Sequence, residues 1–270
     1  MFTIFGAGGF IGSHFTRYLS QAGEPCRPLL RQDGIPVDVN LGHVIYSVGL
    51  TGDFRHRFAE ALEAHVNLVA RILSGCRFES FLYLSSTRVY MGNPSAVETA
   101  PLMADPADPD HFYSITKLMG ESLCLANPNA RVRVARLSNI VGADFEQGNF
   151  ITSLIYQALS QGRIEMNSSL DSEKDYLGIQ DAVKVLHDIA CKGKCRIYNV
   201  ASGNNVTHRE VLAAIKQNID FDVIVNPRAP RTVFKTINIE RMKSEFDCRP
   251  KPPFKELPEI IKTYKQEHRK

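Results

Sequence analysis

Short apolar runs alternate with longer amphipathic segments along the first half of the chain. The short runs are rich in β-branched and aromatic residues, which is typical of buried strands. They cover residues 2–5, 26–31, 43–48, 81–86 and 132–137. The longer segments repeat apolar residues at helical spacing, over about residues 10–22, up to Leu73 and over 114–125. Strands separated by helices predict an α/β fold with a doubly wound parallel sheet that is covered on both faces.

A glycine-rich turn, GAGGFIG, joins the first expected strand to the first expected helix. Gly6, Gly9 and Gly12 follow a G-x-x-G-x-x-G spacing, and Ile11 stands where the more common G-x-G-x-x-G pattern would have its last glycine. Free backbone N–H groups at a helix start, together with the helix dipole, favour a pyrophosphate. The turn therefore predicts a dinucleotide site, with a purely structural turn as the alternative.

The pattern loosens after residue 143. A helix is expected over residues 149–161, another from Gln180, a short strand near 196–200, and a helix opened by Thr207 with Glu210 completing a capping box. A Pro-rich tail follows. We expect a Rossmann-type dinucleotide-binding domain over residues 1–143 and a smaller C-terminal α/β substrate lobe over 144–270. Part of 175–205 is expected to interleave with the first domain.

Composition narrows the class of protein. With 270 residues, 44% hydrophobic and 23% charged, the chain has the composition of an ordinary globular protein with one large core. It has no apolar run long enough for a membrane span and no signal-peptide pattern, so a cytoplasmic location without membrane association is expected. The six cysteines are scattered, and CKGKC lacks a second Cys or His pair, so neither a metal site nor a disulfide framework is expected.

Charge is distributed unevenly along the chain. Residues 221–270 carry 12 Lys and Arg against 7 Asp and Glu, whereas the rest of the chain is slightly acidic. A basic lobe can steer an acidic small molecule, or it can be a solvated surface. The tail has no interleaved aromatic residues and no known module for nucleic acid, so nucleic acid is not an expected partner.

Tyr113 and Lys117, in YSITK, are four residues apart at the start of an expected helix and therefore project from the same face. A phenol with a pKa of about 10 is only about 0.1% ionised at pH 7, and a nearby ammonium favours the phenolate. Such a pair suits acid/base catalysis. The preceding strand ends in Ser85, Ser86 and Thr87, whose hydroxyls fall at the carboxyl end of a parallel sheet, where such folds bind ligands.

Over nearly its whole length the chain resembles the extended short-chain dehydrogenase/reductases of the nucleotide-sugar epimerase/dehydratase family. Five segments carry the resemblance in the family's order: GAGGFIGSHF, SSTRVY, YSITKLMGE, VARLSNIVG and KDYLGIQDAV. The resemblance implies an NAD(P)-dependent enzyme that moves a hydride between the nicotinamide and a carbon of a nucleotide-activated sugar.

Residue roles follow from the same resemblance. Tyr113 would be the catalytic acid/base, Lys117 would lower its pKa and bind the nicotinamide ribose, and Ser86 would bond the reacting oxygen. Asn139 and Arg231 would bind the substrate diphosphate, with a turn residue and a solvated surface arginine as the respective alternatives. Further cofactor contacts, mostly through the backbone, would come from Gly6, Gly9, Phe10, Ile11, Gly12, Ser47, Val48 and Gly49.

The chain departs from the family pattern at two places. Arg31 stands where an acidic residue usually bonds the adenosine ribose; an arginine suits a 2′-phosphate and favours NADP over NAD. The residues that follow, 32–42, are too few for the usual helix and strand. Thr87 and Arg88 stand where the family's 4,6-dehydratases have an Asp-Glu pair, which disfavours dehydration and leaves keto-sugar reduction or epimerisation.

A second class of function stays open at this point. A non-catalytic NAD(P)-binding regulatory protein would use the same fold, although it would normally have lost Tyr113 or Lys117, and both are present. Homodimer formation is also left open, and the identity of the sugar and the nucleotide does not follow from the sequence.

Overall fold

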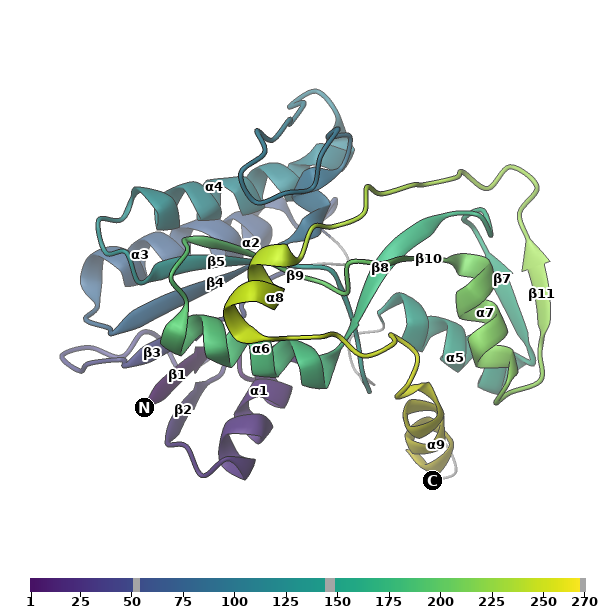
Figure 1. Ribbon diagram of the computed structural model, residues 1–270, viewed down its shortest axis with the longest axis horizontal. Helices are drawn as coiled ribbons and strands as arrows, with labels where there is room; N and C mark the ends of the chain where they lie inside the picture. Colours follow the sequence, from purple (N-terminus) through teal and green to yellow (C-terminus); the bar gives the residue numbers. More distant parts are fainter. Residues whose placement is uncertain (51–53, 144–148, 268–270) are drawn as a thin grey trace.

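The computed structural model describes residues 1–50, 54–143 and 149–267. Its larger part is built on a six-stranded sheet in which all neighbouring strands are parallel. Figure 1 shows this sheet between two layers of helices. The strand order is β2 (Cys26–Leu29), β1 (Phe2–Phe5), β3 (His43–Tyr46), β4 (Ser80–Ser86), β5 (Val132–Leu137) and β9 (Ile197–Val200). This arrangement confirms the Rossmann-type fold expected from the sequence.

Two apolar cores cover the two faces of the sheet. On one face, Ile4 and Leu82 pack with α1 (Phe10–Gln21) and α6 (Ile179–Lys192). On the other face, Tyr46 and Tyr83 pack against a helical layer. That layer consists of α2 (Phe58–Leu62), the π-helical turn η1 (Glu63–Asn67), α3 (Leu68–Gly75) and α4 (Phe112–Ala126). Because strands buried on both faces need apolar side chains on both sides, they carry continuous apolar runs.

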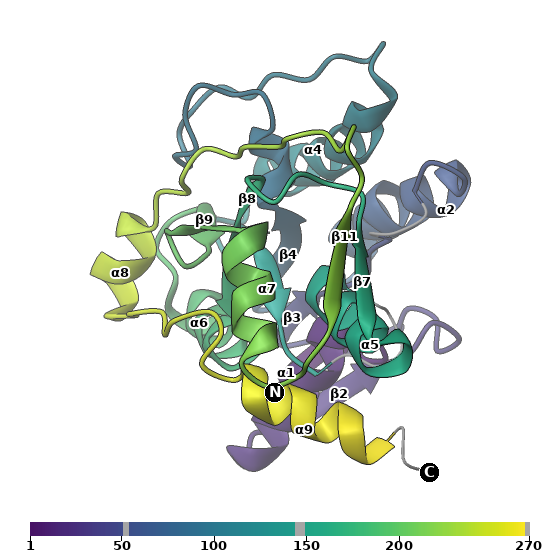
Figure 2. The same ribbon diagram turned by 90° about the vertical axis from the view of Figure 1, so that its right-hand side faces the viewer.

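The smaller lobe lies at the carboxyl ends of the large sheet's strands. It contains a three-stranded sheet, a parallel pair of strands and three helices around a core of their own. Figure 2 shows this side facing the viewer. The elements are β6 (Asn139–Val141), β8 (Glu173–Gly178) and β10 (Asn205–Thr207); β7 (Arg163–Met166) and β11 (Asp222–Val225); and α5 (Phe150–Gln161), α7 (His208–Lys216) and α9 (Leu257–Glu267).

The second half of the chain returns to the large sheet twice. After β8, α6 packs against one face of the large sheet, and β9 forms the edge strand of that sheet next to β5. Later, α8 (Glu240–Phe246) packs against β9 and α6, and its Met242 is fully buried in the same core. The first return lies in the stretch expected to interleave, whereas nothing in the sequence pattern indicates the second.

The connection between β2 and β3 contains no further helix or strand, as the small number of residues in it predicts. The chain runs from Leu30 to Gly42 with no helix or strand, and β2 remains the edge of the sheet.

The capping box expected at the start of α7 is confirmed, because the side chains of Thr207 and Glu210 each accept from the other residue's backbone N–H. The basic tail differs from expectation, because it forms β11, α8 and α9. In the described ranges, no helix is long and apolar enough to cross a membrane.

Candidate active site

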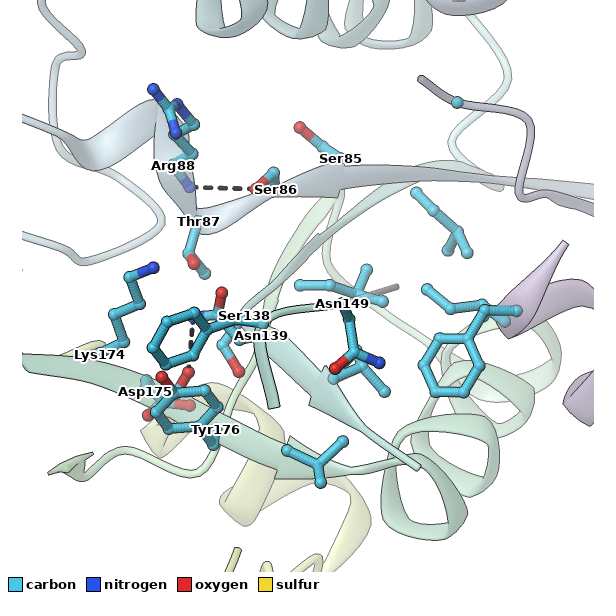
Figure 3. A pocket seen from close by; sticks show the side chains of 18 of the residues that line it. Ser85, Ser86, Thr87, Arg88, Ser138, Asn139, Asn149, Lys174, Asp175 and Tyr176 are labelled. Atoms are coloured by element: carbon cyan, nitrogen blue, oxygen red, sulfur yellow. Dashed lines mark hydrogen bonds between the residues drawn. The ribbon is translucent and has the colours of Figure 1, made fainter. Parts of the chain in front are cut away.

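A cavity of about 610 Å³ opens where the carboxyl ends of β1, β3, β4 and β5 meet the smaller lobe. In Figure 3, residues that follow β4 lie on one side of it, and residues of β6 and β8 on the other. Two short 3₁₀ turns lie between β4 and α4: η2 (Thr87–Tyr90) directly follows β4, and η3 (Pro109–His111) directly precedes α4. Ligands of doubly wound folds bind at this edge of the sheet.

The glycine-rich turn forms one end of the cavity. Gly6, Gly9, Phe10 and Ile11 line it. Gly6 has a φ of +81°, which favours glycine, and a Cβ there would lie 3.0 Å from the backbone of Ser47. Within the described residues, no side chain caps the start of α1, so its first N–H groups remain available to an anion. The turn therefore fits the pyrophosphate of a dinucleotide.

The end of β3 forms the floor beside this turn. Ser47, Val48 and Gly49 line the cavity. The Ser47 hydroxyl donates to the carbonyl of Phe5 at 2.7 Å, so its side chain links two strands. A Cβ on Gly49 would lie 3.4 Å from the Lys117 ammonium nitrogen. These three residues offer mainly backbone to a ligand.

Tyr113, Lys117 and Ser86 are brought together at the middle of the cavity. The first two project from α4, and Ser86 ends β4. Tyr113 and Lys117 are only 6% and 3% exposed. The Lys117 ammonium donates to the carbonyl of Leu84 at 3.0 Å and lies 6.0 Å from the centre of the Tyr113 ring. A phenol, a hydroxyl and an amine around one space can hold and protonate a single oxygen.

Burial raises the pKa of Tyr113 to about 12, while hydrogen bonding by Ser86 and the positive charge of Arg88 act in the opposite direction. Lys117 was expected to be the cation that lowers this pKa. In the structure, Arg88 is the cation that lowers it. Tyr113 is therefore a protonated phenol at neutral pH, which suits a proton donor.

Burial lowers the pKa of Lys117 to about 7, and the negative charge of Glu121 opposes this shift. Glu121 lies one turn further along α4 and accepts hydrogen bonds from Ser85 at 2.5 Å and from Arg136 at 2.6 Å. The Glu121–Arg136 pair is almost fully buried. This pair links the end of β4, α4 and β5 behind Tyr113 and Lys117.

His65 supports the site from the π-helical turn. Its Nε2 accepts from the backbone N–H of Leu50 at 3.2 Å, so Nδ1 carries the proton and donates to Thr116 Oγ1 at 2.9 Å. Burial, followed by the charge of Lys117, lowers the pKa of His65 to about 2. The neutral ring also packs edge-on against Tyr113. His65 thus joins the loop after β3 to α4.

The smaller lobe supplies the other end of the cavity through β6 and β8. Asn139 lines it and donates to the carbonyl of Asp175 at 2.8 Å. Lys174 also lines it, and its ammonium lies 4.9 Å from the centre of the Phe150 ring. Burial, and then the charge of Arg88, lowers the Lys174 pKa. Lys174 forms no ion pair with the part of the chain that the structure describes.

Asp175 is the only carboxylate among the described residues that line the cavity. Its Oδ1 accepts from the N–H of Ser202 at 2.9 Å, and its Oδ2 accepts from the N–H of Gly203 at 2.7 Å and of Asn204 at 3.1 Å. The carboxylate is therefore engaged in holding the turn before β10.

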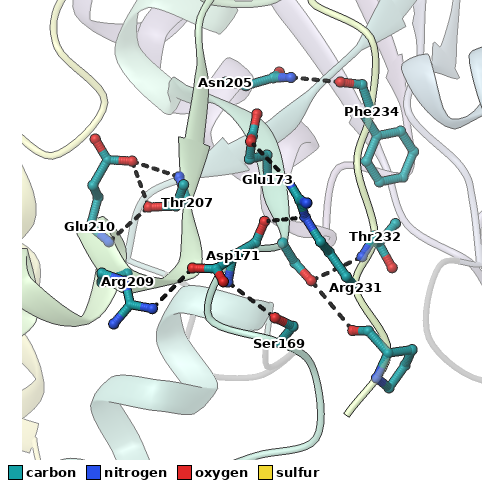
Figure 4. A network of polar contacts seen from close by, with 12 residues as sticks. Ser169, Asp171, Glu173, Asn205, Thr207, Arg209, Glu210, Arg231, Thr232 and Phe234 are labelled. Carbon is teal, nitrogen blue, oxygen red and sulfur yellow. Dashed lines mark hydrogen bonds and ion pairs between the residues drawn. The ribbon is translucent and has the colours of Figure 1, made fainter.

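Three residues expected at the site lie outside the cavity lining. Gly12 lies where α1 packs against the glycine-rich turn. A Cβ at Gly12 would lie 2.2 Å from the carbonyl oxygen of Gly6. The Arg31 side chain is 85% exposed and lies 3.4 Å from Glu60. The Arg231 side chain is 61% exposed and lies 3.9 Å from Glu173. Figure 4 shows Arg231 within a surface network, where it also donates to the carbonyl of Asp171.

Several lining residues were not anticipated from the sequence. Lys174 opens the KDYLGIQDAV segment, which was recognised as a motif without a role for its lysine. Asn149 caps α5, at the start of a helix that was expected. Phe54 and Phe234 lie in stretches without periodicity, so no sequence signal pointed to them.

Comparison with known proteins assigns the chain to a family. The model of the NAD dependent epimerase/dehydratase family matches residues 2–201, which is most of the chain. The chain belongs to this family. Its members are NAD-dependent epimerases and dehydratases, in agreement with the Rossmann-type sheet and the glycine-rich turn.

Curated relatives come from the same group of enzymes. A dTDP-4-dehydro-6-deoxy-D-allose reductase from Streptomyces sp is 22% identical over 96% of this chain and 94% of its own length. A dTDP-glucose 4,6-dehydratase from Streptomyces griseus is 25% identical over 50% of this chain and 42% of its own length. The family is thus represented by relatives with more than one chemistry.

Solved structures share the fold. MoeE5 in complex with UDP-glucose and NAD has a TM-score of 0.81 at 20% identity, covering 98% of this chain and 99% of its own. RMD from Pseudomonas aeruginosa, complexed with NADPH, has a TM-score of 0.77 at 21% identity, covering 98% of this chain and 99% of its own.

Proposed function

We propose that this protein is an NAD(P)-dependent enzyme that reduces the keto group of a nucleotide-activated sugar. The observation that carries the proposal is that one continuous cavity is lined by the glycine-rich turn at one end, Ser86, Tyr113 and Lys117 in the middle, and Lys174 at the other end. A coenzyme and a substrate diphosphate can lie at opposite ends of such a cavity with the reacting atoms between them.

The bound nicotinamide would supply the hydride. Tyr113 gives its phenolic proton to the oxygen of the reacting carbon, and Ser86 holds that oxygen by a hydrogen bond. Lys117 orients the nicotinamide ribose and stabilises the phenolate left on Tyr113. The buried phenol, with its pKa of about 12, is in the form needed for reduction.

Binding at the substrate end requires cations for the diphosphate. Lys174 is our preferred group, because it lines the cavity and its ammonium lacks a carboxylate partner among the described residues. Asn139 lies beside it. Arg231 is the weaker candidate, because its charge is exposed and near Glu173. For the coenzyme, Arg31 follows the edge strand where an adenosine 2′-phosphate would approach, which favours NADP.

Dehydration is not proposed, although dehydratases are among the relatives. Elimination requires an acid and a base near the sugar, and Thr87 and Arg88 cannot act as a carboxylate pair. The one described carboxylate lining the cavity, Asp175, is engaged by backbone N–H groups. Epimerisation is the second candidate: a retained oxidised coenzyme would take a hydride from the sugar carbon and return it to the other face, while the same tyrosine, lysine and serine would move and hold the proton of the attached oxygen.

A panel of nucleotide sugars and nucleotide-linked keto sugars, incubated with NADPH or NADH, tests the proposal. We expect coenzyme oxidation with one keto sugar and none with the corresponding alcohol. A purified protein that retains its coenzyme and interconverts two alcohols without net oxidation would favour epimerisation. Coenzyme binding without turnover on any member of the panel would favour the non-catalytic regulatory protein.

A further inference from the structure

Arg88 is a cation that the proposed reduction does not use. It lies two residues after Ser86, in η2, and its backbone N–H donates to the Ser86 hydroxyl oxygen at 3.2 Å. Its side chain lines the same cavity as Ser86 and Tyr113. In Figure 3, Arg88 and Ser86 come from the same stretch of chain, with Lys174 across from them. Arg88 therefore belongs to the catalytic part of the cavity.

The guanidinium of Arg88 has an aromatic neighbour and forms no ion pair with any carboxylate that the structure describes; its charge acts on Asp110 only at longer range. It lies 5.6 Å from the centre of the Phe54 ring, which itself packs against Tyr113 with ring centres 5.4 Å apart. Its Nε is buried and forms no hydrogen bond, and no carboxylate in residues 1–50, 54–143 or 149–267 pairs with it. A buried guanidinium nitrogen without a hydrogen-bond partner is unfavourable unless a ligand supplies the acceptor.

A neighbouring arginine shows what a satisfied group looks like. Arg55 lies 4.9 Å from the centre of the same Phe54 ring, but its guanidinium pairs with Asp110, and it does not line the cavity. Two arginines thus share one aromatic ring, and only the one facing the cavity lacks a carboxylate. This contrast indicates that the partner of Arg88 is a ligand.

The position of Arg88 decides which part of a ligand it meets. The coenzyme pyrophosphate fits the glycine-rich turn after β1, and Lys174 is the group assigned to the substrate diphosphate. The Arg88 guanidinium lies over the Phe54 ring that packs against Tyr113, and its charge acts on the Tyr113 phenol. It is therefore on the side of the sugar ring whose oxygen Ser86 and Tyr113 would hold. We propose that Arg88 binds a carboxylate carried by that sugar, so that the substrate is a nucleotide-linked uronic acid or a related acidic sugar. This inference rests on the proposed function.

A guanidinium is well suited to this task, because its planar fork can donate two parallel hydrogen bonds to a carboxylate. The nearby charge of Arg88 also lowers the pKa of Tyr113. A bound carboxylate would cancel part of that effect and keep the phenol protonated until it is needed. An acidic sugar therefore agrees with the proton-donor role of Tyr113.

Calorimetric titration of the coenzyme-loaded protein with matched nucleotide sugars tests the inference. The pairs are UDP-glucose with UDP-glucuronate and GDP-mannose with GDP-mannuronate, and free UDP and GDP serve as diphosphate probes. We expect the acidic member of the recognised pair to bind about tenfold to 100-fold more tightly than the neutral one. Arg88→Gln should remove this preference, Arg88→Lys should keep part of it, and Arg55→Gln, which removes the same charge beside the same ring, should retain it.

Two results would overturn the inference alone. One is equal or tighter binding of the neutral sugar. The other is an Arg88→Gln variant that weakens UDP or GDP as much as the acidic sugar, which would make Arg88 a diphosphate ligand. If no nucleotide sugar and no free nucleotide bound, the proposed function would fail, and the inference would fail with it.

Discussion

The two ends of the cavity use their polar groups differently. At the cofactor end and around Lys117 in the middle, the side chains are already engaged: the Ser47 hydroxyl bonds Phe5, the Lys117 ammonium bonds Leu84, and His65 bonds both Leu50 and Thr116. What is left for a ligand is mostly backbone. The side chains at this end need no rearrangement to receive a ligand. We expect coenzyme affinity there to depend on the glycines and on the backbone N–H groups at the start of α1.

At the substrate end, and at Arg88 across from it, several lining side chains have a buried polar atom with no hydrogen-bond partner in the described chain: Arg88, Ser138, Asn149, Tyr176 and Asn205. Buried polar groups are normally paired, so a concentration of unpaired ones at one end of a cavity indicates where ligand contacts are still to be made. Substitutions at the two ends should therefore have different consequences.

The largest effect is expected at the boundary between the two ends. General acid catalysis typically contributes about 10²–10⁴-fold, so Tyr113→Phe should lower kcat by that order and leave coenzyme affinity nearly unchanged. Lys117→Ala should impair both, because Lys117 is assigned to the coenzyme as well. Steady-state kinetics on the true substrate and coenzyme titration provide the two readouts. A Tyr113→Phe variant that keeps more than about a tenth of the turnover would assign the proton transfer to another group.

The next effect compares Lys174, a half-buried cation that lines the cavity, with Arg231, an exposed one. Charge-assisted contacts to phosphate contribute about 1.5–3 kcal/mol, so Lys174→Met should raise KM for the nucleotide sugar roughly tenfold or more, with a smaller change in kcat. Arg231→Met removes the same charge from the surface network and should change KM less. The reverse order would return the diphosphate to Arg231, the residue first expected from the sequence.

A smaller effect is expected for coenzyme choice. The Arg31 side chain is largely exposed, so its contact with a 2′-phosphate should favour NADP over NAD by only a few-fold to about tenfold. Arg31→Ala should remove the preference, and the difference should shrink at high salt because the contact is solvent-screened. Equal dissociation constants for the two coenzymes in the unchanged protein would contradict this assignment.

A last effect, on stability instead of function, concerns Lys117. The pKa of Lys117 is lowered from 10.5 to about 7 in the folded protein, so above pH 7 the unfolded chain binds more protons there than the folded one. The free energy of unfolding should therefore gain a favourable contribution as pH rises from about 7 toward 9. Denaturant titrations of the coenzyme-free protein should show this gain, and Lys117→Met should abolish it.

Lys262→Met, which changes an exposed lysine of α9, is the matched control for this titration and should keep the pH-dependent gain. Parallel pH profiles for the unchanged protein and Lys117→Met would mean that Lys117 stays charged when buried.

The cofactor half of the molecule could be predicted from the sequence because its signals are local. The run Phe2–Phe5, the glycine-rich turn and the four-residue spacing of Tyr113 and Lys117 each specify a geometry within a few residues. The lack of a helix or strand after β2 could also be predicted, because the segment 32–42 is too short to hold them.

The substrate end depends on long-range packing and could be predicted less well. Arg231 has the composition of a phosphate ligand, but its fold position puts it beside Glu173 on the surface. Lys174 reaches the cavity because β8 pairs with β6, a contact between distant segments that no periodicity encodes. Arg88 was recognised only as a departure from an acidic pair, and its position beside Phe54 required the three-dimensional structure.

The most direct test of the central claim is whether hydride passes between a coenzyme and a nucleotide sugar in this cavity. The protein would be loaded with NADPH carrying deuterium at the transferred position and mixed with the acidic keto sugar selected by the binding and turnover screens, with mass spectrometry of the sugar product. We predict that one deuterium appears on the carbon that bore the keto group, and that Tyr113→Phe slows its appearance by about 10²–10⁴-fold while still binding both ligands. Binding of coenzyme and sugar without any deuterium in the sugar would contradict the account.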